Sequence, residues 1–298
     1  MTSPDLHLEP SQRVLTGLIG RDILASRSPW LHEKEADAQG LRLLYTLLDF
    51  SARGWKDTAL PEVLDSAQHL GFAGVNVTFP FKQAILPYLD ALSPGAQRIG
   101  AVNTVSFADG KRTGFNTDVT GFSESFTQSL PDAALTCAVQ LGAGGAGSAT
   151  AQALLESGVQ RLIIFDSEPQ KCLALVKKLK AEFGTSRAAA GDDLARAASI
   201  ADGILNATPV GMTKLPGLPL PAALIEPRHW VADIVYFPLE TELLREAKHR
   251  GCRTLNGSGM AIHQAAGAFE IFTGLRPDRE RMQKSFVDFV SGPVVQAA

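Results

Sequence analysis

A glycine-rich turn between a strand and a helix limits this chain to a small number of folds. The turn consists of Gly142, Ala143, Gly144, Gly145, Ala146 and Gly147 and has the spacing G-x-G-x-x-G. The apolar stretch before it (136–141) predicts a strand, and the alanine-rich stretch after it (148–156) predicts a helix. This context is typical of a Rossmann-type dinucleotide-binding domain, where the glycines allow a tight turn, close approach of a pyrophosphate and close helix–strand packing.

An acidic residue follows the next predicted strand, RLIIF (161–165). Asp166 lies 19 residues beyond Gly147, where a carboxylate accepts hydrogen bonds from ribose hydroxyls and repels a 2′-phosphate. No arginine follows it, and Lys171 is the nearest cation, so Lys171 is included among the cofactor-binding candidates. We therefore expect NAD in preference to NADP. The alternative is an ordinary βα turn with an exposed aspartate. That alternative does not explain why the strand, the three glycines, the helix and the acidic residue all occur at the spacing of a dinucleotide-binding motif.

Alternating strand and helix patterns on both sides of the turn predict an α/β protein of two domains. We expect an N-terminal α/β substrate domain formed by residues 1–119 and 260–298, and a doubly wound, Rossmann-type NAD-binding domain formed by residues 120–259. Asp109-Gly110 predicts a hairpin between strands 102–107 and 111–115. Further strands are expected at 14–19, 41–48, 74–78, 203–205 and 231–235, and further helices at 29–39, 61–70, 122–130, 170–183, 194–201, 260–273 and 278–290.

Composition and charge exclude several classes of protein. Lysine and arginine total 28 against 31 acidic residues, so nothing indicates a nucleic-acid surface. No stretch approaches the ~20 apolar residues that span a bilayer, and the N-terminus lacks a secretory signal pattern. Three widely spaced cysteines, Cys137, Cys172 and Cys252, favour free buried thiols in the cytoplasm over a disulfide framework or a metal site. We expect a monomer or homodimer that acts on a small molecule.

Polar side chains gather where predicted strands of the N-terminal domain end, which is where open α/β sheets bind ligands. Four clusters share this position: Ser26 with Ser28, Asn76 with Thr78 and Lys82, Asn103 with Thr104, and Asn116 with Thr117 and Asp118. Together they supply hydroxyls, amides, one amine and one carboxylate. This set suits a small polyhydroxylated acid bound in a cleft between the domains, with Lys82 and Asp118 able to take the proton of a secondary alcohol.

Each cluster also has a purely structural interpretation. Ser28 alone would serve as an N-cap, and a lone lysine such as Lys82 is usually a solvated surface charge. Asn103 inside an apolar strand needs a hydrogen-bond partner wherever it lies. The stretch from Asn116 to Asp118 could form an Asx-type turn.

Eight stretches between Gly17 and Gly274 together resemble the shikimate dehydrogenase family, and within it the NAD-preferring quinate/shikimate dehydrogenase branch. They are GLIGRDILASRSPWLH, GVNVTFPFKQ, GAVNTV, GFNTD, LGAGGAG, NATPVGM, DIVYFP and NGSGMAIHQAAGAFEIFTG. The resemblance implies reversible oxidation of a ring hydroxyl, either of shikimate to 3-dehydroshikimate or of quinate to 3-dehydroquinate. NADP-dependent members usually carry Asn-Arg-Thr/Ser where this chain has Phe165-Asp166-Ser167, in agreement with the ribose argument for NAD.

The resemblance also implies roles for single residues. Lys82 would be the catalytic acid/base, Asp118 would be its partner, and Ser26 and Ser28 would hold the substrate carboxylate. Contacts to ring hydroxyls would come from Asn76, Thr78, Asn103, Tyr236 and Gln264. The dinucleotide would be held by residues 142–146 and Asp166, with Thr208, Pro209, Val235 and Gly257 at its nicotinamide end.

Three other functions remain open at this point. A related dehydrogenase could act on an aminated shikimate analogue, because substrate choice depends on few side chains. A catalytically silent NAD- and ligand-binding regulator is a second alternative, against which the presence of both Lys82 and Asp118 weighs. A two-domain folate dehydrogenase also pairs a dinucleotide domain with a lysine, but lacks the SxSP and NTD stretches found here.

Overall fold

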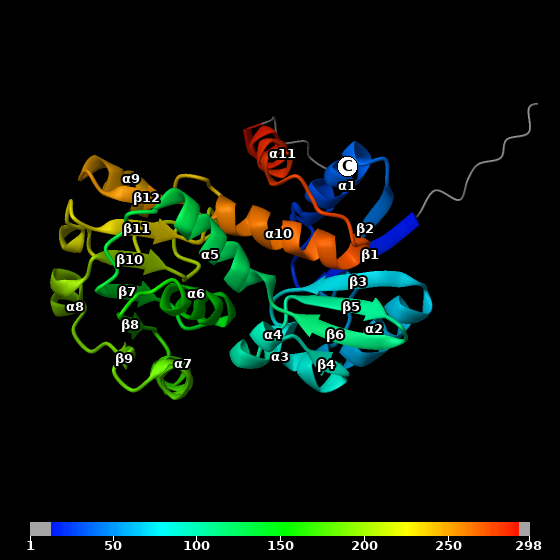
Figure 1. Ribbon diagram of the computed structural model, residues 1–298, viewed down its shortest axis with the longest axis horizontal. Coiled ribbons are helices and arrows are strands. Elements are labelled where there is room, and N and C mark those ends of the chain that lie inside the picture. The colour runs from blue at the N-terminus through cyan, green and yellow to red at the C-terminus, as the bar shows by residue number, and fades with distance from the viewer. Residues whose placement is uncertain (1–12, 292–298) are drawn as a thin grey trace, which may run out of the picture. The chain divides into compact units, whose positions relative to one another are not determined.

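The computed structural model describes residues 13–291 of the chain (Figure 1). The two ends of the chain, residues 1–12 and 292–298, lie outside the described part. The expected absence of a secretory signal and the two ends of the expected substrate domain therefore fall on residues that the structure does not describe. The chain forms two compact units: one contains the residues up to Asn116 and from Ala265 onward, and the other contains Thr117–Gln264. None of the described helices is long and apolar enough to cross a membrane.

The first unit is built on a mixed six-stranded sheet, sheet A, in the order β2-β1-β3-β5-β6-β4. Its strands are β1 (Arg13–Gly20), β2 (Arg42–Asp49), β3 (Phe72–Val77), β4 (Ala91–Leu92), β5 (Thr104–Ala108) and β6 (Lys111–Phe115). The predicted hairpin is confirmed, because β5 pairs with β6 in antiparallel register. Asp109 and Gly110 both have positive φ, 52° and 73°, as the tight turn between two twisted strands requires.

Helices cover both faces of sheet A. They are α1 (Ser28–Ala38), α2 (Leu60–His69), α3 (Phe81–Ala84), α4 (Pro94–Ile99), α11 (Arg279–Ser291) and the end of α10 (Ser258–Thr273). On one face, Ile19 and Val75 pack with Leu64 of α2 and Phe81 of α3 in a fully buried cluster. Val14 packs on the opposite face in a cluster that includes Phe269 of α10. Alternate strand residues therefore serve two different cores.

Several short elements of the first unit were not predicted. β4 has only two residues, α4 begins at Pro94, and α3 comprises Phe81–Ala84. Lys82 lies within α3, which the chain enters one residue earlier, at the fully buried Phe81. Helix α5 (Thr117–Ser129) likewise begins five residues before the expected start, so Asp118 lies in its first turn and not at the end of a strand.

The second unit carries a fully parallel six-stranded sheet, sheet B, in the order β12-β11-β10-β7-β8-β9 (Figure 1). Its strands are β7 (Cys137–Leu141), β8 (Arg161–Phe165), β9 (Ala188–Ala190), β10 (Gly203–Asn206), β11 (Trp230–Asp233) and β12 (Arg253–Leu255). The chain starts in the middle at β7, adds two strands on one side and then three on the other. This order confirms the predicted doubly wound, Rossmann-type fold, and its direction reverses between β7 and β10.

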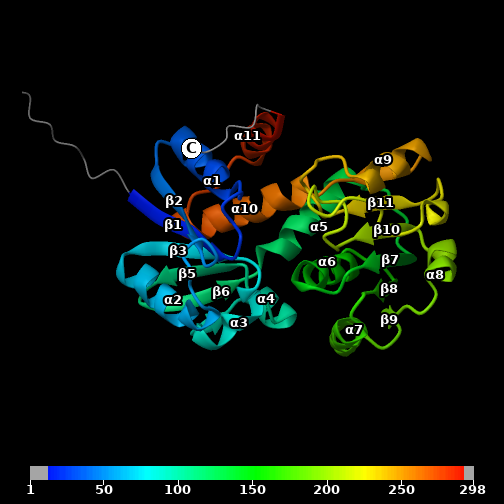
Figure 2. The same ribbon diagram turned by 180° about the vertical axis from the view of Figure 1, so that it is seen from behind.

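Helices pack on both faces of sheet B, shown from two sides in Figures 1 and 2. They are α5, α6 (Gly145–Glu156), α7 (Pro169–Phe183), α8 (Leu194–Ile200) and α9 (Glu242–His249). Val139 and Ile204 share one core with Ala197 of α8 and Leu244 of α9. The sequence did not predict β9 or α9, since β9 is a run of alanines and α9 carries many charges, although Leu243, Leu244 and Ala247 form its buried face.

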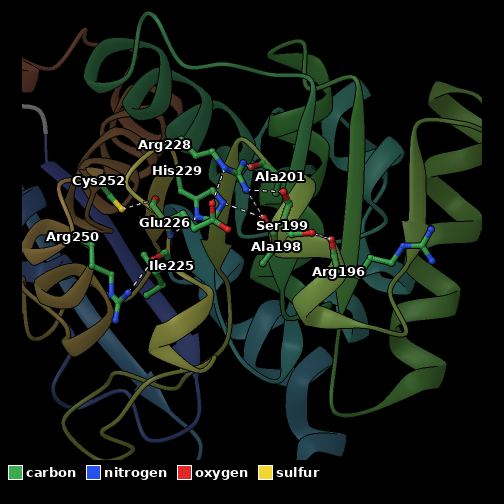
Figure 3. A network of polar contacts seen from close by, with 10 residues as sticks. All are labelled: Arg196, Ala198, Ser199, Ala201, Ile225, Glu226, Arg228, His229, Arg250 and Cys252. Atoms are coloured by element: carbon green, nitrogen blue, oxygen red, sulfur yellow. Dashed lines mark hydrogen bonds and ion pairs between the residues drawn. The ribbon is translucent and has the colours of Figure 1, made fainter.

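The loop before β11 contains a polar network that explains a buried histidine (Figure 3). The Arg228 guanidinium donates to the carbonyl oxygens of Ala198, Ser199 and Ala201, where α8 ends. His229 Nδ1 accepts from the Glu226 amide at 3.0 Å, so Nε2 is the nitrogen that donates to the Ala198 carbonyl. Burial lowers the pKa of His229, and this histidine is therefore a neutral structural residue.

Within the first unit, a charged contact joins the last helix, α11, to α1. Glu35 of α1 accepts hydrogen bonds from Arg281 Nη2 at 2.7 Å, Arg281 Nε at 2.8 Å, the Asp278 amide at 2.9 Å and Gln39 Nε2 at 2.6 Å. Burial raises the pKa of Glu35, but these hydrogen bonds outweigh it, so the pKa lies below its ordinary value of 4.5. The Glu35 carboxylate therefore joins α1 to the start of α11.

We expect Glu35→Gln to lower the free energy of unfolding at pH 7 by about 2 kcal/mol, because charged hydrogen bonds to Arg281 are lost. Since the folded pKa is depressed, the difference from wild type is fully present above pH 4.5 and is lost as the pH falls through the lower folded value. Urea titrations across pH 3–7 measure it. Glu270→Gln, at an exposed position of α10, is the matched control, and equal losses in both variants would contradict the assignment.

Candidate functional site

The glycine-rich turn lies directly after β7, at the point where the strand order of sheet B reverses. Gly142 has a φ of +102°, and a Cβ there would lie 2.6 Å from the Ala207 carbonyl oxygen. A Cβ on Gly147 would lie 2.4 Å from the Gly142 carbonyl oxygen. By contrast, a Cβ on Gly144 would meet no atom within 4 Å. Two glycines are therefore required by backbone packing, and the middle one faces open space.

A buried glutamine that the sequence analysis missed supports this turn from below. Gln140 Nε2 donates to the carbonyl oxygens of Gly142 and Gly147, both at 2.8 Å, and its Oε1 accepts from Thr150 Oγ1 at 3.0 Å. Both hydrogens of the Gln140 amide are thereby used on the two ends of the turn. A polar residue in the middle of the apolar strand 136–141 was the available signal.

The backbone of the turn presents hydrogen-bond donors at the start of α6. Gly144 is the N-cap residue, and within the described chain no side chain caps this helix. The first amides of a helix carry partial positive charge and bind phosphate groups. The open space at Gly144, together with the uncapped helix, fits the pyrophosphate of a dinucleotide.

Asp166 is connected directly to the turn. Its Oδ2 accepts from the Ala143 amide at 2.6 Å, and its Oδ1 accepts from the Glu168 amide at 2.7 Å. A carboxylate has about four acceptor positions, so two remain for hydroxyl donors such as those of a ribose. Lys171 lies on the first turn of α7 and pairs with Glu168, and both side chains are exposed.

The loop after β10 is held against the same edge of sheet B. Asn206 Oδ1 accepts from the Thr208 amide at 3.0 Å and from Thr208 Oγ1 at 2.6 Å. Asn206 Nδ2 donates to the Val210 carbonyl and to Asp233 Oδ1. Asp233 Oδ1 also accepts from the Val235 amide at 3.0 Å. These bonds bring the segments of Thr208-Pro209 and Val235 together, and the sequence analysis assigned no role to Asn206 or Asp233.

The remaining candidates of the second unit lie on the segments around Gly257 and Tyr236 and on helices α5 and α10. A Cβ on Gly257 would lie 2.2 Å from the Ile234 carbonyl oxygen, so Gly257 packs against the segment that carries Val235 and Tyr236. Tyr236 is 43% exposed. Gln264 lies within α10, where its Nε2 donates to the Ala261 carbonyl at 3.1 Å, and Asp118 lies on α5.

Polar residues of the first unit meet at one edge of sheet A. Asn76, near the end of β3, pairs in register with Thr104 at the start of β5, because these two strands are antiparallel. The expectation that Asn103 lies inside a strand is corrected here, because Asn103 precedes β5. Its main-chain N–H donates to the Phe115 carbonyl at 3.0 Å. Asn116 follows β6, and its Nδ2 donates to the Ala101 carbonyl at 3.0 Å.

The two serines form their own turn before α1. Ser26 Oγ accepts from the Ser28 amide at 3.3 Å and lies 3.2 Å from Ser28 Oγ. The alternative that Ser28 caps the helix is wrong, because Ser28 is its first residue and Arg27 occupies the cap position. The sequence analysis missed the buried Tyr45, whose hydroxyl donates to Asn76 Oδ1 at 2.8 Å.

Lys82 belongs to the same edge through its backbone. Its carbonyl accepts from the Val102 amide at 2.8 Å, next to Asn103, and its side chain is partly buried. The half-buried Thr78 precedes the cis Phe79–Pro80 peptide bond that leads into α3. The first unit thus gathers Ser26, Ser28, Asn76, Thr78, Lys82 and Asn103 around the ends of β1, β3 and β5.

The three cysteines are buried and form no disulfide, as predicted. Among residues 13–291, no group of three or more histidine, cysteine, aspartate or glutamate side chains could hold a metal ion.

Comparison with known families and proteins gives matches along most of the chain. Residues 18–105 match the model of the shikimate dehydrogenase substrate binding domain, and residues 257–285 match the shikimate 5′-dehydrogenase C-terminal domain. A shikimate dehydrogenase (NADP(+)) of Streptomyces avermitilis is 50% identical over 95% of this chain and 98% of the relative. A quinate/shikimate dehydrogenase (NAD(+)) of Corynebacterium efficiens is 46% identical over 92% of this chain and 98% of the relative.

Solved structures agree with these matches. The quinate dehydrogenase of Corynebacterium glutamicum in complex with NAD aligns with a TM-score of 0.87 and 44% identity, covering 93% of this chain and 99% of that protein. A shikimate 5-dehydrogenase of Listeria monocytogenes in complex with shikimate and NAD aligns with a TM-score of 0.83 and 32% identity. The alignment covers 92% of this chain and 96% of that protein.

We expect Asp233→Asn to change how the stability of the protein depends on pH. Burial raises the pKa of Asp233 to about 6, although hydrogen bonds from Thr241, Val235 and Asn206 act in the opposite direction. Between the ordinary value of 3.8 and about 6 the folded state binds more protons than the unfolded state, so this group makes wild type less stable as the pH rises. The amide variant should gain roughly 3 kcal/mol relative to wild type across this range.

Chemical denaturation at pH 3.5, 5 and 7 measures this gain. Asp132→Asn removes an exposed carboxylate from the same unit and serves as the control. Stability curves that stay parallel for wild type and Asp233→Asn would show that this carboxyl group titrates normally.

Proposed function

Because this chain belongs to the shikimate dehydrogenase family, we propose that it oxidises the ring hydroxyl of shikimate, of quinate or of both, with NAD as the preferred cofactor. The observation that carries the proposal is the combination of two features: a phosphate-binding turn at the reversal point of sheet B, and hydroxyl, amide and amine groups at one edge of sheet A. The reaction is reversible and yields the corresponding ring ketone. Free buried thiols favour a cytoplasmic site of action.

We assign substrate binding to residues of the first unit together with Tyr236 and Gln264 of the second, and dinucleotide binding to the second unit. Ser26 and Ser28 hold the substrate carboxylate through their hydroxyls, while Asn76, Thr78, Asn103, Tyr236 and Gln264 bind ring hydroxyls. The turn from Gly142 to Ala146 receives the pyrophosphate, Asp166 receives the ribose hydroxyls, and Thr208, Pro209, Val235 and Gly257 line the nicotinamide end. Lys171 is a weaker candidate for the ribose end, since its amine is already paired with Glu168.

The chemical step needs a base for one proton. When bound, the dinucleotide supplies a hydride acceptor, so the chain itself must take the proton that leaves the hydroxyl oxygen. Lys82 is the amine at the polar edge of sheet A, and its main chain is joined to the segment of Asn103. We assign the proton transfer to Lys82 and propose Asp118 as the second catalytic residue, positioning the amine and the substrate.

The preference for NAD rests on the negative charge around the ribose position. Asp166 is held in place by two backbone amides, and Glu168 follows it two residues later in the sequence. A 2′-phosphate would meet this charge without an arginine to bind it. The relatives of this chain include dehydrogenases named for NADP and for NAD, and the kinetic ratio of the two cofactors tests the assignment.

We expect Lys82→Ala to lower kcat by about 10²–10⁴-fold, because the general base is removed. The dissociation constant for NAD, measured by quenching of protein fluorescence, should stay within about 2-fold of wild type, since the turn of the second unit is unchanged. Gln83→Ala, at the exposed neighbouring position of α3, is the control and should retain turnover. Ordinary turnover by Lys82→Ala would reject the assignment of this residue.

We expect wild type to show a kcat/KM for NAD at least about 10-fold above that for NADP, measured by absorbance at alkaline pH with shikimate and with quinate. Asp166→Asn should reduce this ratio, because the repulsion of the 2′-phosphate is weakened. Asp132→Asn carries the same charge change at an exposed loop position and should not alter it. A wild type that prefers NADP would overturn the role of Asp166, and a wild type inactive with both acids would refute the proposed function.

A further inference from the structure

Two neighbouring strands of sheet B end in a buried amide–carboxylate pair. Asn206 is the last residue of β10 and Asp233 is the last residue of β11, and the two are partners in the parallel register. Their exposed fractions are 0% and 1%. Burying a carboxylate is unfavourable unless hydrogen-bond donors surround it, and here the donors come from three segments of the second unit.

The orientation of the Asn206 amide follows from its partners. Asn206 Nδ2 donates to the Val210 carbonyl at 2.9 Å and to Asp233 Oδ1 at 3.0 Å, so both hydrogens of the amide are used on groups that accept. Its Oδ1 therefore faces Thr208, where it accepts from the main-chain N–H at 3.0 Å and from Oγ1 at 2.6 Å. One side chain thus fixes the loop after β10 at positions 208 and 210.

These bonds also determine what Thr208 can contribute. A hydroxyl has one hydrogen, and the hydrogen of Thr208 is donated to Asn206 Oδ1. Thr208 Oγ1 in turn accepts from the Val210 amide at 3.2 Å. The hydroxyl of Thr208 is therefore part of a local turn and has no hydrogen left for a cofactor atom. Thr208 contributes the position of its loop to the cofactor site.

Asp233 holds the loop after β11 in the same way. Its Oδ1 accepts from the Val235 amide at 3.0 Å, and its Oδ2 accepts from Thr241 Oγ1 at 2.7 Å, at the residue that caps α9. The loop after β10 also passes close to this carboxylate, because a Cβ on Gly211 would lie 3.6 Å from Asp233 Oδ2. The carboxylate is thus the point at which the loops after β10 and β11 are joined.

Resting on the proposed function, we infer that Asn206 and Asp233 are positioning residues that hold the two loops at the nicotinamide end of the dinucleotide site in one fixed arrangement. Asn206 fixes the loop of Thr208, and Asp233 fixes the segment of Val235. The bond between their side chains couples the two loops, so that breaking it leaves each loop free to shift by itself.

The phosphate-binding turn does not depend on this pair. The main chain at Ala207 lies against Gly142, but it is held there by the bond from the Ala207 N–H to the Leu141 carbonyl at 2.7 Å, which involves no side chain. Asp166 is bound to the Ala143 and Glu168 amides on the other side of the turn. Loss of the pair should therefore affect the nicotinamide end and spare the phosphate and adenosine end.

Asn206→Asp keeps the size of the side chain and the acceptor for Thr208, but turns an oxygen toward two acceptors. At pH 8, above the Asp233 pKa of about 6, we expect the Kd for NAD to rise about 10-fold in calorimetric titrations, because binding must then order the loops. The Kd for ADP, which has the adenosine and both phosphates but no nicotinamide, should stay within about 2-fold of wild type. With NAD saturating, kcat should fall at least about 10-fold, while the KM for shikimate or quinate stays within about 3-fold.

Gln160→Glu is the matched control, because it makes the same change from amide to acid at an exposed position directly before β8. Asn206→Ala removes the whole amide without adding charge, so the proposal stays testable if Asn206→Asp does not fold. Thermal denaturation of all variants measures the structural cost.

Equal rises in the Kd for NAD and for ADP, or an unchanged Kd for NAD in the folded Asn206 variants, would overturn the positioning role. A wild type that binds neither NAD nor ADP refutes the dinucleotide site and this role with it. A wild type that binds both but oxidises neither acid refutes the proposed reaction alone, and the two Kd values still decide the role of the pair.

Discussion

The close approach of two main-chain segments after β7 is the constraint on which the second unit depends. The Gly142 carbonyl occupies the space that a Cβ of Gly147 would need, and Gly142 itself lies against the Ala207 carbonyl. This contact allows α6 to start immediately above the strand and directs its first amides outward. Gln140 donates to the carbonyls of both Gly142 and Gly147 and so joins the two ends of the turn. The proposed pyrophosphate and ribose contacts, from residues 142–146 and Asp166, are arranged around this turn.

Both units use buried asparagine or glutamine side chains to pair the polar groups at their strand ends. The strand ends proposed to bind ligands also bury polar groups, and a buried amide side chain bridges neighbouring segments at each of them. Gln140 and Asn206 do this in sheet B, and Asn76 does it in sheet A. An amide suits this task because it donates and accepts at once, so one side chain can hold two loops in a defined relation. The residues proposed to meet substrate and cofactor are thereby oriented before any ligand arrives.

The sequence predicted the parts of this structure that depend on local pattern. The turn around Gly142, the hairpin at Asp109-Gly110 and the doubly wound order of the second unit follow from spacing and period, and the structure confirms them. The supporting residues could not be predicted in the same way. Tyr45 and Asn76 are 31 positions apart, and their bond arises only from the register of β2, β1 and β3.

Short elements escaped prediction for a similar reason. α3 has four residues and β4 has two, too few to show a hydrophobic period. The start of α5 was placed too late because Asn116, Thr117 and Asp118 read equally well as a turn. In each case tertiary packing, such as the burial of Phe81, decided what the local sequence left open.

The second unit is inserted into the first along the chain, and this has a consequence for synthesis. All strands of sheet A have been synthesised once Phe115 has been added, yet Phe269 of its core and the arginine that pairs with Glu35 are translated only after residues 117–264. During that interval α1 carries an acidic side chain that lacks its cationic partner, and one face of the sheet lacks its cover. The first unit can therefore complete its core only after the C-terminal helices have been synthesised. The inserted unit can complete its own sheet before that point.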